Sequence, residues 1–107
     1  MVTIRNAKDR IKNLVIDLKK SGYNPSRVIL FGSLAKQQAT EWSDIDVAIW
    51  DDRFEGSAAI DYEPILPLLR NYPRLELHPF HTTETADTNP FIIEIEKDGI
   101  EIHANNL

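Results

Sequence analysis

The sequence contains no cysteine and no long apolar run. Without cysteine, the chain of 107 residues can form neither a disulfide framework nor a thiolate metal site, which fits a reducing cytoplasm. Its longest aliphatic or aromatic runs, such as residues 28–31, are about four residues long, far too short to span a membrane. The first ten residues carry charges where a signal peptide needs an apolar stretch. We therefore expect a cytoplasmic protein with no membrane segment.

Glycine and proline are also scarce, with four and six residues respectively. Together with 42% hydrophobic and 27% charged residues, this composition is typical of a small globular domain. A chain of this length buries roughly two-thirds of its unfolded surface, which is enough for one modest core. We expect residues 1–107 to form a single domain that holds any large substrate or partner from outside.

Basic residues are outnumbered by acidic ones, 12 to 17, and the net charge is −5. A net-acidic domain lacks the field that drives non-specific DNA binding, so direct binding of nucleic acid is not expected. The imbalance is local, because residues 41–63 hold eight acidic residues and one basic residue. Such a concentration of carboxylates either binds a cation or lies on a solvated face.

Hydrophobic periodicity predicts alternating helices and strands, which indicates an α/β (α+β) sheet covered by helices. Thr3 is a candidate N-cap for the first helix and Gly22 ends it. Two prolines predict a kink or a late start in the second helix, and Pro79 places its strand near an edge or end. The expected helices are 3–21, 57–71 and 91–98, with a short helix or turn at 33–40, and the expected strands are 27–31, 44–50, 74–80 and 100–103.

The strand 44–50 alternates with period two. Ile45, Val47 and Ile49 share one face, which we expect to pack beneath the helix 3–21. Asp44 and Asp46 share the other face, which should therefore be open. Their mutual repulsion is relieved by a hard divalent cation such as Mg²⁺, which prefers one or two protein carboxylates plus water and phosphate oxygens.

A Gly32-Ser33 turn ends the strand before this carboxylate pair. Glycine allows the backbone to come close to a ligand, and the free N–H groups at the start of a following helix favour an anion. Either feature alone is common. In this order and with this short connection, they predict a phosphate cradle beside a cation site.

These residues resemble a known signature. Gly32-Ser33, followed by Ser43-Asp44-Ile45-Asp46 and an apolar strand, is similar to the motif of the polymerase-β-like nucleotidyltransferases, and the length resembles their minimal prokaryotic members. The resemblance covers nearly the whole chain. It implies a small mixed sheet backed by helices and Mg²⁺- or Mn²⁺-dependent transfer of a nucleoside monophosphate, with ATP as the expected donor.

The resemblance also implies roles for residues. Asp44, Asp46 and a third acid on a neighbouring strand would bind the ions and act in catalysis, and the candidate for that third acid is Glu76, where the family more often has aspartate. The nucleotide would be bound by Gly32, Ser33, Lys36 and Ser43. Each has a plainer alternative as a solvated or loop residue. Gln37 replaces a common glycine, which suggests a different loop path over the triphosphate.

Three further residues lie near this motif. His78 is two positions beyond Glu76 on the same face and could aid proton transfer, although the three histidines lack metal-ligand spacing. Trp50 is expected to pack. Trp42 could stack on a nucleobase or cover the loop.

The resemblance finally implies a partner. Minimal nucleotidyltransferases are typically encoded with a helical protein of the HEPN type and act as its antitoxin, in some cases by transferring AMP to a tyrosine. A catalytically weak binding module that masks a toxin is the alternative, which Gln37 and Glu76 favour. Transfer to a small molecule fits less well, because those enzymes usually add a domain. A basic stripe on the first helix, either a partner contact or a solubility feature, consists of Arg5, Lys8, Lys12 and Lys19.

Overall fold

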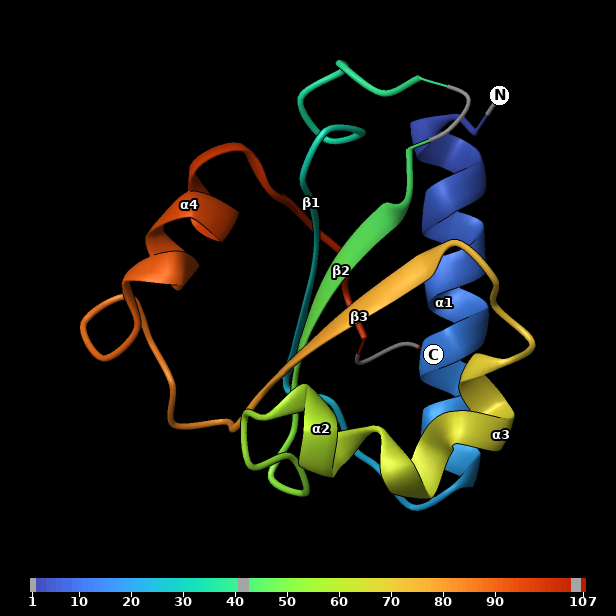
Figure 1. The fold of residues 1–107 in the computed structure, drawn as a ribbon, viewed down its shortest axis with the longest axis vertical. Helices are drawn as coiled ribbons and strands as arrows, with labels where there is room; N and C mark the ends of the chain where they lie inside the picture. The colour runs from blue at the N-terminus through green and yellow to red at the C-terminus, as the bar shows by residue number, and fades with distance from the viewer. Residues whose placement is uncertain (1, 41–42, 105–106) are drawn as a thin grey trace.

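The protein is a mixed four-stranded sheet with helices against both faces (Figure 1). The computed structural model describes residues 2–40, 43–104 and 107. No helix in these ranges is both long enough and apolar enough to cross a membrane. In chain order the elements are α1 (Ile4–Lys20), β1 (Arg27–Phe31), β2 (Ile45–Trp50), α2 (Ala58–Asp61), the 3₁₀ helix η1 (Glu63–Ile65), α3 (Leu66–Leu69), β3 (Leu75–Phe80), α4 (Pro90–Asp98) and β4 (Ile100–Glu101).

The strand order is β3-β2-β1-β4. β1 pairs antiparallel with both β2 and β4, whereas β2 and β3 run parallel. This confirms the mixed sheet, and it confirms that the strand containing Pro79 lies at a sheet edge. Because β2 and β3 are parallel and in register, residues that start both strands are brought to the same end of the sheet.

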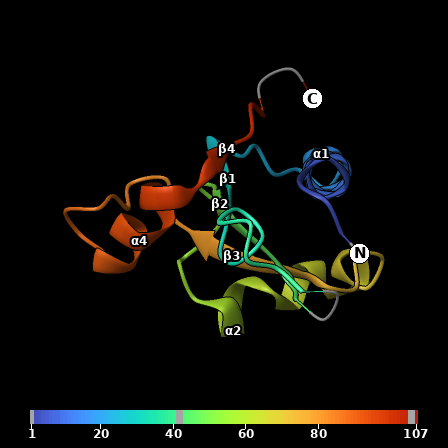
Figure 2. The same ribbon diagram turned by 90° about the horizontal axis from the view of Figure 1, so that it is seen from above.

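One face of the sheet packs against α1 (Figure 2). Ile45, Val47 and Ile49 are buried with the apolar stripe of α1, as their alternation predicts. The helix begins as expected, because the Thr3 hydroxyl accepts a hydrogen bond from the Asn6 amide at 3.1 Å. This layer is the larger of the two cores.

The opposite face is covered for part of its length by α4, which corrects the expectation of a wholly open face. Ala48 and Trp50 are buried there, together with Ile92 and Ile95 of α4. The physical reason is that only the first outward positions of strand 44–50 are acidic, and the later ones are apolar. The second face is therefore apolar at one end and acidic, and open, at the other.

The second expected helix differs in the structure. The segment 57–71 is divided into α2, η1 and α3, because each proline lacks the N–H that a continuous helix requires. Residues 33–37 form a hydrogen-bonded turn, which is one of the two forms expected for 33–40. The last expected strand is also shorter than predicted and ends at Glu101.

Two acids of the negatively charged segment 41–63 are neither solvated nor placed at the open face. Asp51 and Asp61 are buried, with 1% and 4% of their surface exposed. Asp51 accepts hydrogen bonds from the amides of Asn24 and Arg53, and Asp61 accepts from three consecutive amides, 55–57. These carboxylates hold loops together, because each replaces backbone partners that the loops lack.

Candidate metal and nucleotide site

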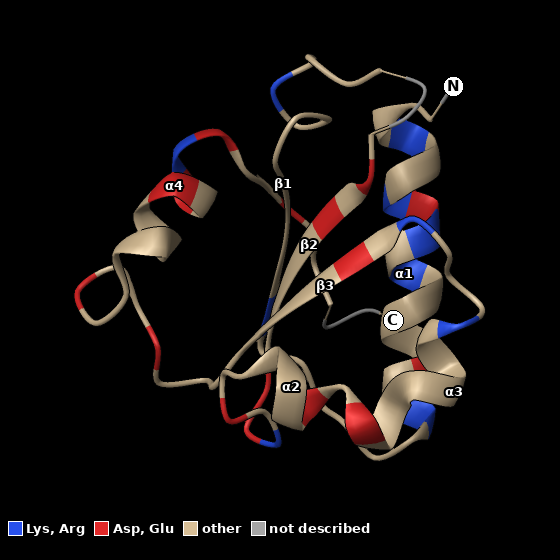
Figure 3. Ribbon diagram, in the orientation of Figure 1, with Lys and Arg blue, Asp and Glu red and all other residues tan. Residues whose placement is uncertain are grey.

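The register of the sheet brings Asp46 and Glu76 together. Asp46 of β2 lies directly opposite Glu76 of β3, and β2 and β3 carry neighbouring acidic positions at the same end of the sheet (Figure 3). The Asp46 side chain is 24% exposed and that of Glu76 is 54% exposed. Both carboxylates are therefore accessible to a ligand from the open end of the second face.

His78 completes this group. Its Nε2 lies 3.2 Å from Asp46 Oδ1 and 4.0 Å from Glu76 Oε1. One ligand atom from each of the three residues lies within 4.8 Å of the others. The sequence predicts that His78 shares a face with Glu76. It does not predict the contact with Asp46, because spacing along one strand does not show which residue of the neighbouring strand lies beside it.

Gly32 is in close contact with this group. It has a φ of +79°, a conformation that side chains rarely adopt, and a Cβ at this position would lie 2.3 Å from Asp46 Oδ2. The sequence predicts that the backbone at this glycine comes close to a ligand. In the structure, the group that lies closest to Gly32 is the Asp46 carboxylate. The Gly32-Ser33 turn and the acidic group are parts of one site.

The turn after Gly32 leaves polar groups available. Among the described residues, no hydrogen-bond acceptor binds the backbone N–H of Ser33, Leu34 or Ala35, or the Ser33 hydroxyl. The expected helix dipole is absent because no helix forms here. A run of unpaired amides next to a glycine with positive φ still suits an anion such as a phosphate.

Gln37 and Lys36 lie on this turn, and both are exposed. Gln37 has a φ of +58°, so it adopts the left-handed conformation that glycine adopts more easily. The substitution therefore does not prevent the chain from forming a left-handed turn here.

Asp44 and Ser43 lie just before β2. Asp44 is exposed and is not a member of the group of Asp46, Glu76 and His78. The Ser43 hydroxyl accepts a hydrogen bond from the Thr40 amide at 2.9 Å, and its carbonyl accepts one from Arg74 at 2.8 Å. Ser43 therefore shapes the loop that precedes the site. Trp42 lies outside the described residues.

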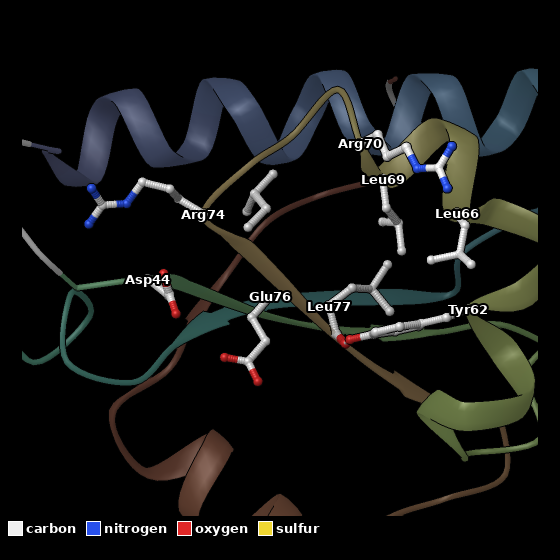
Figure 4. A pocket seen from close by; sticks show the side chains of 9 residues that line it. Asp44, Tyr62, Leu66, Leu69, Arg70, Arg74, Glu76 and Leu77 are labelled. Atoms are coloured by element: carbon white, nitrogen blue, oxygen red, sulfur yellow. The ribbon is translucent and has the colours of Figure 1, made fainter.

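A pocket of about 430 Å³ runs along β3 and connects Asp44 with Glu76 (Figure 4). Its floor is apolar, with Leu77 and residues of α3, and Arg70 also lines it. Tyr62 lines the same pocket and donates a hydrogen bond to the Leu77 carbonyl. Burial raises the pKa of Tyr62, and the Glu76 carboxylate raises it further, so Tyr62 remains a neutral donor beside the acidic group.

Comparison with known proteins gives the same family as the motif. The family model described as polymerase beta, nucleotidyltransferase, matches residues 11–106. The chain therefore belongs to the polymerase-β-like nucleotidyltransferase family, and its mixed sheet with helices is consistent with that fold. No curated protein and no solved structure matches the chain.

The family typically uses divalent metal ions, and the donor set of this chain fits one. Two carboxylates and an imidazole with ligand atoms within 4.8 Å of one another are groups that bind divalent cations. Their accessibility from one open end of the sheet leaves room for the oxygens of a further ligand.

Proposed function

We propose that this chain is a cytoplasmic nucleotidyltransferase, dependent on Mg²⁺ or Mn²⁺, that transfers AMP from ATP to a hydroxyl group of a partner protein. The observation that carries this proposal is the contact between the Gly32-Ser33 turn and Asp46, with Glu76 opposite Asp46. Together they place unpaired amides for a triphosphate next to carboxylates for a cation.

The residues have distinct parts in this reaction. The amides after Gly32 and the Ser33 hydroxyl would bind and orient the triphosphate, and Lys36 is the nearest candidate counter-charge on the turn. Asp46 and Glu76, with Asp44 at the rim, would hold the metal, which supplies charge neutralisation at the phosphate oxygens. Glu76, the more exposed carboxylate, would accept the proton of the attacking hydroxyl.

The acceptor would enter through the pocket along β3. That pocket is apolar at its floor, opens to solvent and ends at Asp44 and Glu76, so it suits a side chain that carries a hydroxyl on an apolar body, such as tyrosine. A docked protein would also exclude water from the site, which this small chain cannot do alone.

The resemblance to minimal nucleotidyltransferases supports a helical HEPN-type partner and an antitoxin role. The basic stripe of α1 is poorly placed to contact a partner that docks at Asp46. The Lys19 ammonium donates to the carbonyls of Ala104 and Leu107, and α1 lies on the face of the sheet away from Asp46. A partner that uses both surfaces would have to reach round the sheet.

The test is incubation of the protein encoded by the neighbouring gene with this chain, ATP and Mg²⁺, followed by intact-mass spectrometry. We expect a mass increase of one AMP on the partner, and none with the Asp44→Asn variant. A stable complex without adduct would favour the toxin-masking module. Modification of a small-molecule acceptor without any partner would contradict the protein acceptor.

A further inference from the structure

We propose that the group of Asp46, Glu76 and His78 selects a first-row transition-metal ion over Mg²⁺, with His78 Nε2 as a direct ligand of the ion. The inference rests on the proposed function, because it takes Asp46 and Glu76 as the carboxylate ligands. It adds a nitrogen ligand and a metal preference to that site.

The geometry allows one ion to contact all three residues. With ligands about 2.1 Å from the ion, adjacent ligand atoms are about 3.0 Å apart in an octahedral site and about 3.4 Å apart in a tetrahedral one. The separation of 3.2 Å between His78 Nε2 and Asp46 Oδ1 lies between these values. Glu76 Oε1, at 4.0 Å from Nε2, is on a flexible side chain that is half exposed and can close the remaining distance.

The imidazole of His78 is held in this orientation by its neighbours. The Phe31 ring meets it edge-on at 4.8 Å between centroids, and the Phe91 ring lies 5.9 Å away. Phe31 is itself the β1 residue opposite Asp46, so the same strand register positions the carboxylate and the support of the ring. Nε2 therefore faces the carboxylates without a further rearrangement.

The chemistry of the ligand decides the preference. Imidazole nitrogen binds Co²⁺ and Zn²⁺ well, whereas Mg²⁺ prefers oxygen ligands and keeps its water. An all-carboxylate site would lack this discrimination. The competing role for His78 is a hydrogen bond that only orients Asp46, and loss of that bond would weaken the binding of every divalent ion to the same extent.

The experiment compares Co²⁺, Mn²⁺ and Mg²⁺ binding by calorimetry without nucleotide, and follows Co²⁺ also by its visible absorption. His78→Gln keeps a polar atom near the position of Nε2 but replaces imidazole by an amide. We expect it to weaken Co²⁺ binding by about 10- to 100-fold, to leave Mg²⁺ binding nearly unchanged and to alter the Co²⁺ spectrum. The matched control is His103→Gln, an exposed histidine outside the group, which should change none of these readouts.

Equal losses of Co²⁺ and Mg²⁺ affinity in His78→Gln would overturn the inference and assign His78 the orienting role. Asp46→Asn separates this failure from that of the proposed function. If Asp46→Asn leaves all metal binding unchanged, the carboxylate site itself is wrong. If it abolishes binding while His78→Gln preserves the ratio of Co²⁺ to Mg²⁺ affinity, only the nitrogen ligand is wrong. His78→Asn, with its fold checked by circular dichroism, provides a second variant.

Discussion

Gly32 and Asp46 approach each other so closely that a side chain at position 32 would overlap the carboxylate, with 2.3 Å between a Cβ and Asp46 Oδ2. Gly32→Ala should therefore displace Asp46 as well as strain a backbone with positive φ. We expect a loss of about 1–3 kcal/mol in the free energy of unfolding and a loss of divalent-metal binding. Urea denaturation and Mn²⁺ titration measure the two effects.

The control for this variant is Gly22→Ala. Gly22 also has a positive φ, of +95°, and its added Cβ would meet only the flexible end of Arg53, far from the acidic group along the chain. Gly22→Ala should lose folding stability but keep metal binding. Loss of metal binding in both variants would contradict the direct effect on Asp46.

Asp46→Asn should abolish metal binding that depends on nucleotide, because it removes a charge at the centre of the group. The fold should remain intact or become slightly more stable, since repulsion between neighbouring carboxylates is relieved. Calorimetry with ATP and Mg²⁺ on parent and variant measures the effect. Asp9→Asn, at an exposed position of α1, is the control. Equal binding by Asp46→Asn and the parent would disprove the site.

Gln37→Gly should stabilise the turn that follows Gly32. A residue with a side chain in the left-handed region costs about 1–2 kcal/mol, and the greater freedom of glycine in the unfolded chain offsets part of this gain. We expect a net increase of up to about 1 kcal/mol in the free energy of unfolding, measured by urea denaturation. Gln38→Gly, at a neighbouring exposed position without positive φ, should be neutral or destabilising.

Two isoleucines of α4 test how the second face is covered. Ile95 is fully buried against the sheet, whereas Ile93 is 53% exposed on the same helix. Ile95→Ala should lower the free energy of unfolding by about 2–5 kcal/mol, because it leaves a cavity. Ile93→Ala should change it by less than about 0.5 kcal/mol. If chemical denaturation shows similar losses of stability for Ile95→Ala and Ile93→Ala, α4 does not pack as described.

The environment of Tyr72 predicts that the protein loses stability at alkaline pH. Burial, a hydrogen bond to Asp17 and the charge of that carboxylate raise the pKa of Tyr72 to about 12. The unfolded chain, with a tyrosine pKa of about 10, loses this proton first, so the stabilisation is complete below about pH 10 and is lost as pH rises toward about 12. Urea midpoints at about pH 9 and about pH 11 should diverge less in Tyr72→Phe than in the parent. Identical pH dependence would contradict this assignment.

Local patterns were sufficient for several elements. The capping hydroxyl of Thr3 and the helical spacing of the apolar residues predict α1, and the alternation in 45–49 predicts which side chains of β2 meet that helix. The motif around Gly32 and Asp46 indicates the family that the matching model shows. These features depend on neighbours within a few positions along the chain, so the sequence alone carries them.

Tertiary structure decided the rest, because it depends on contacts between segments far apart in the chain. Ala48 and Trp50 are buried in a cluster that includes Ile92 and Ile95 of α4, some forty residues later in the chain. Asp51 and Asp61 are loop anchors and not surface charges because backbone amides converge on them. The placement of His78 beside Asp46 follows from the parallel register of β2 and β3, which no spacing within either strand reveals. The sequence therefore determined the family, the first helix and the carboxylate motif, whereas strand pairing decided which side chains share the site.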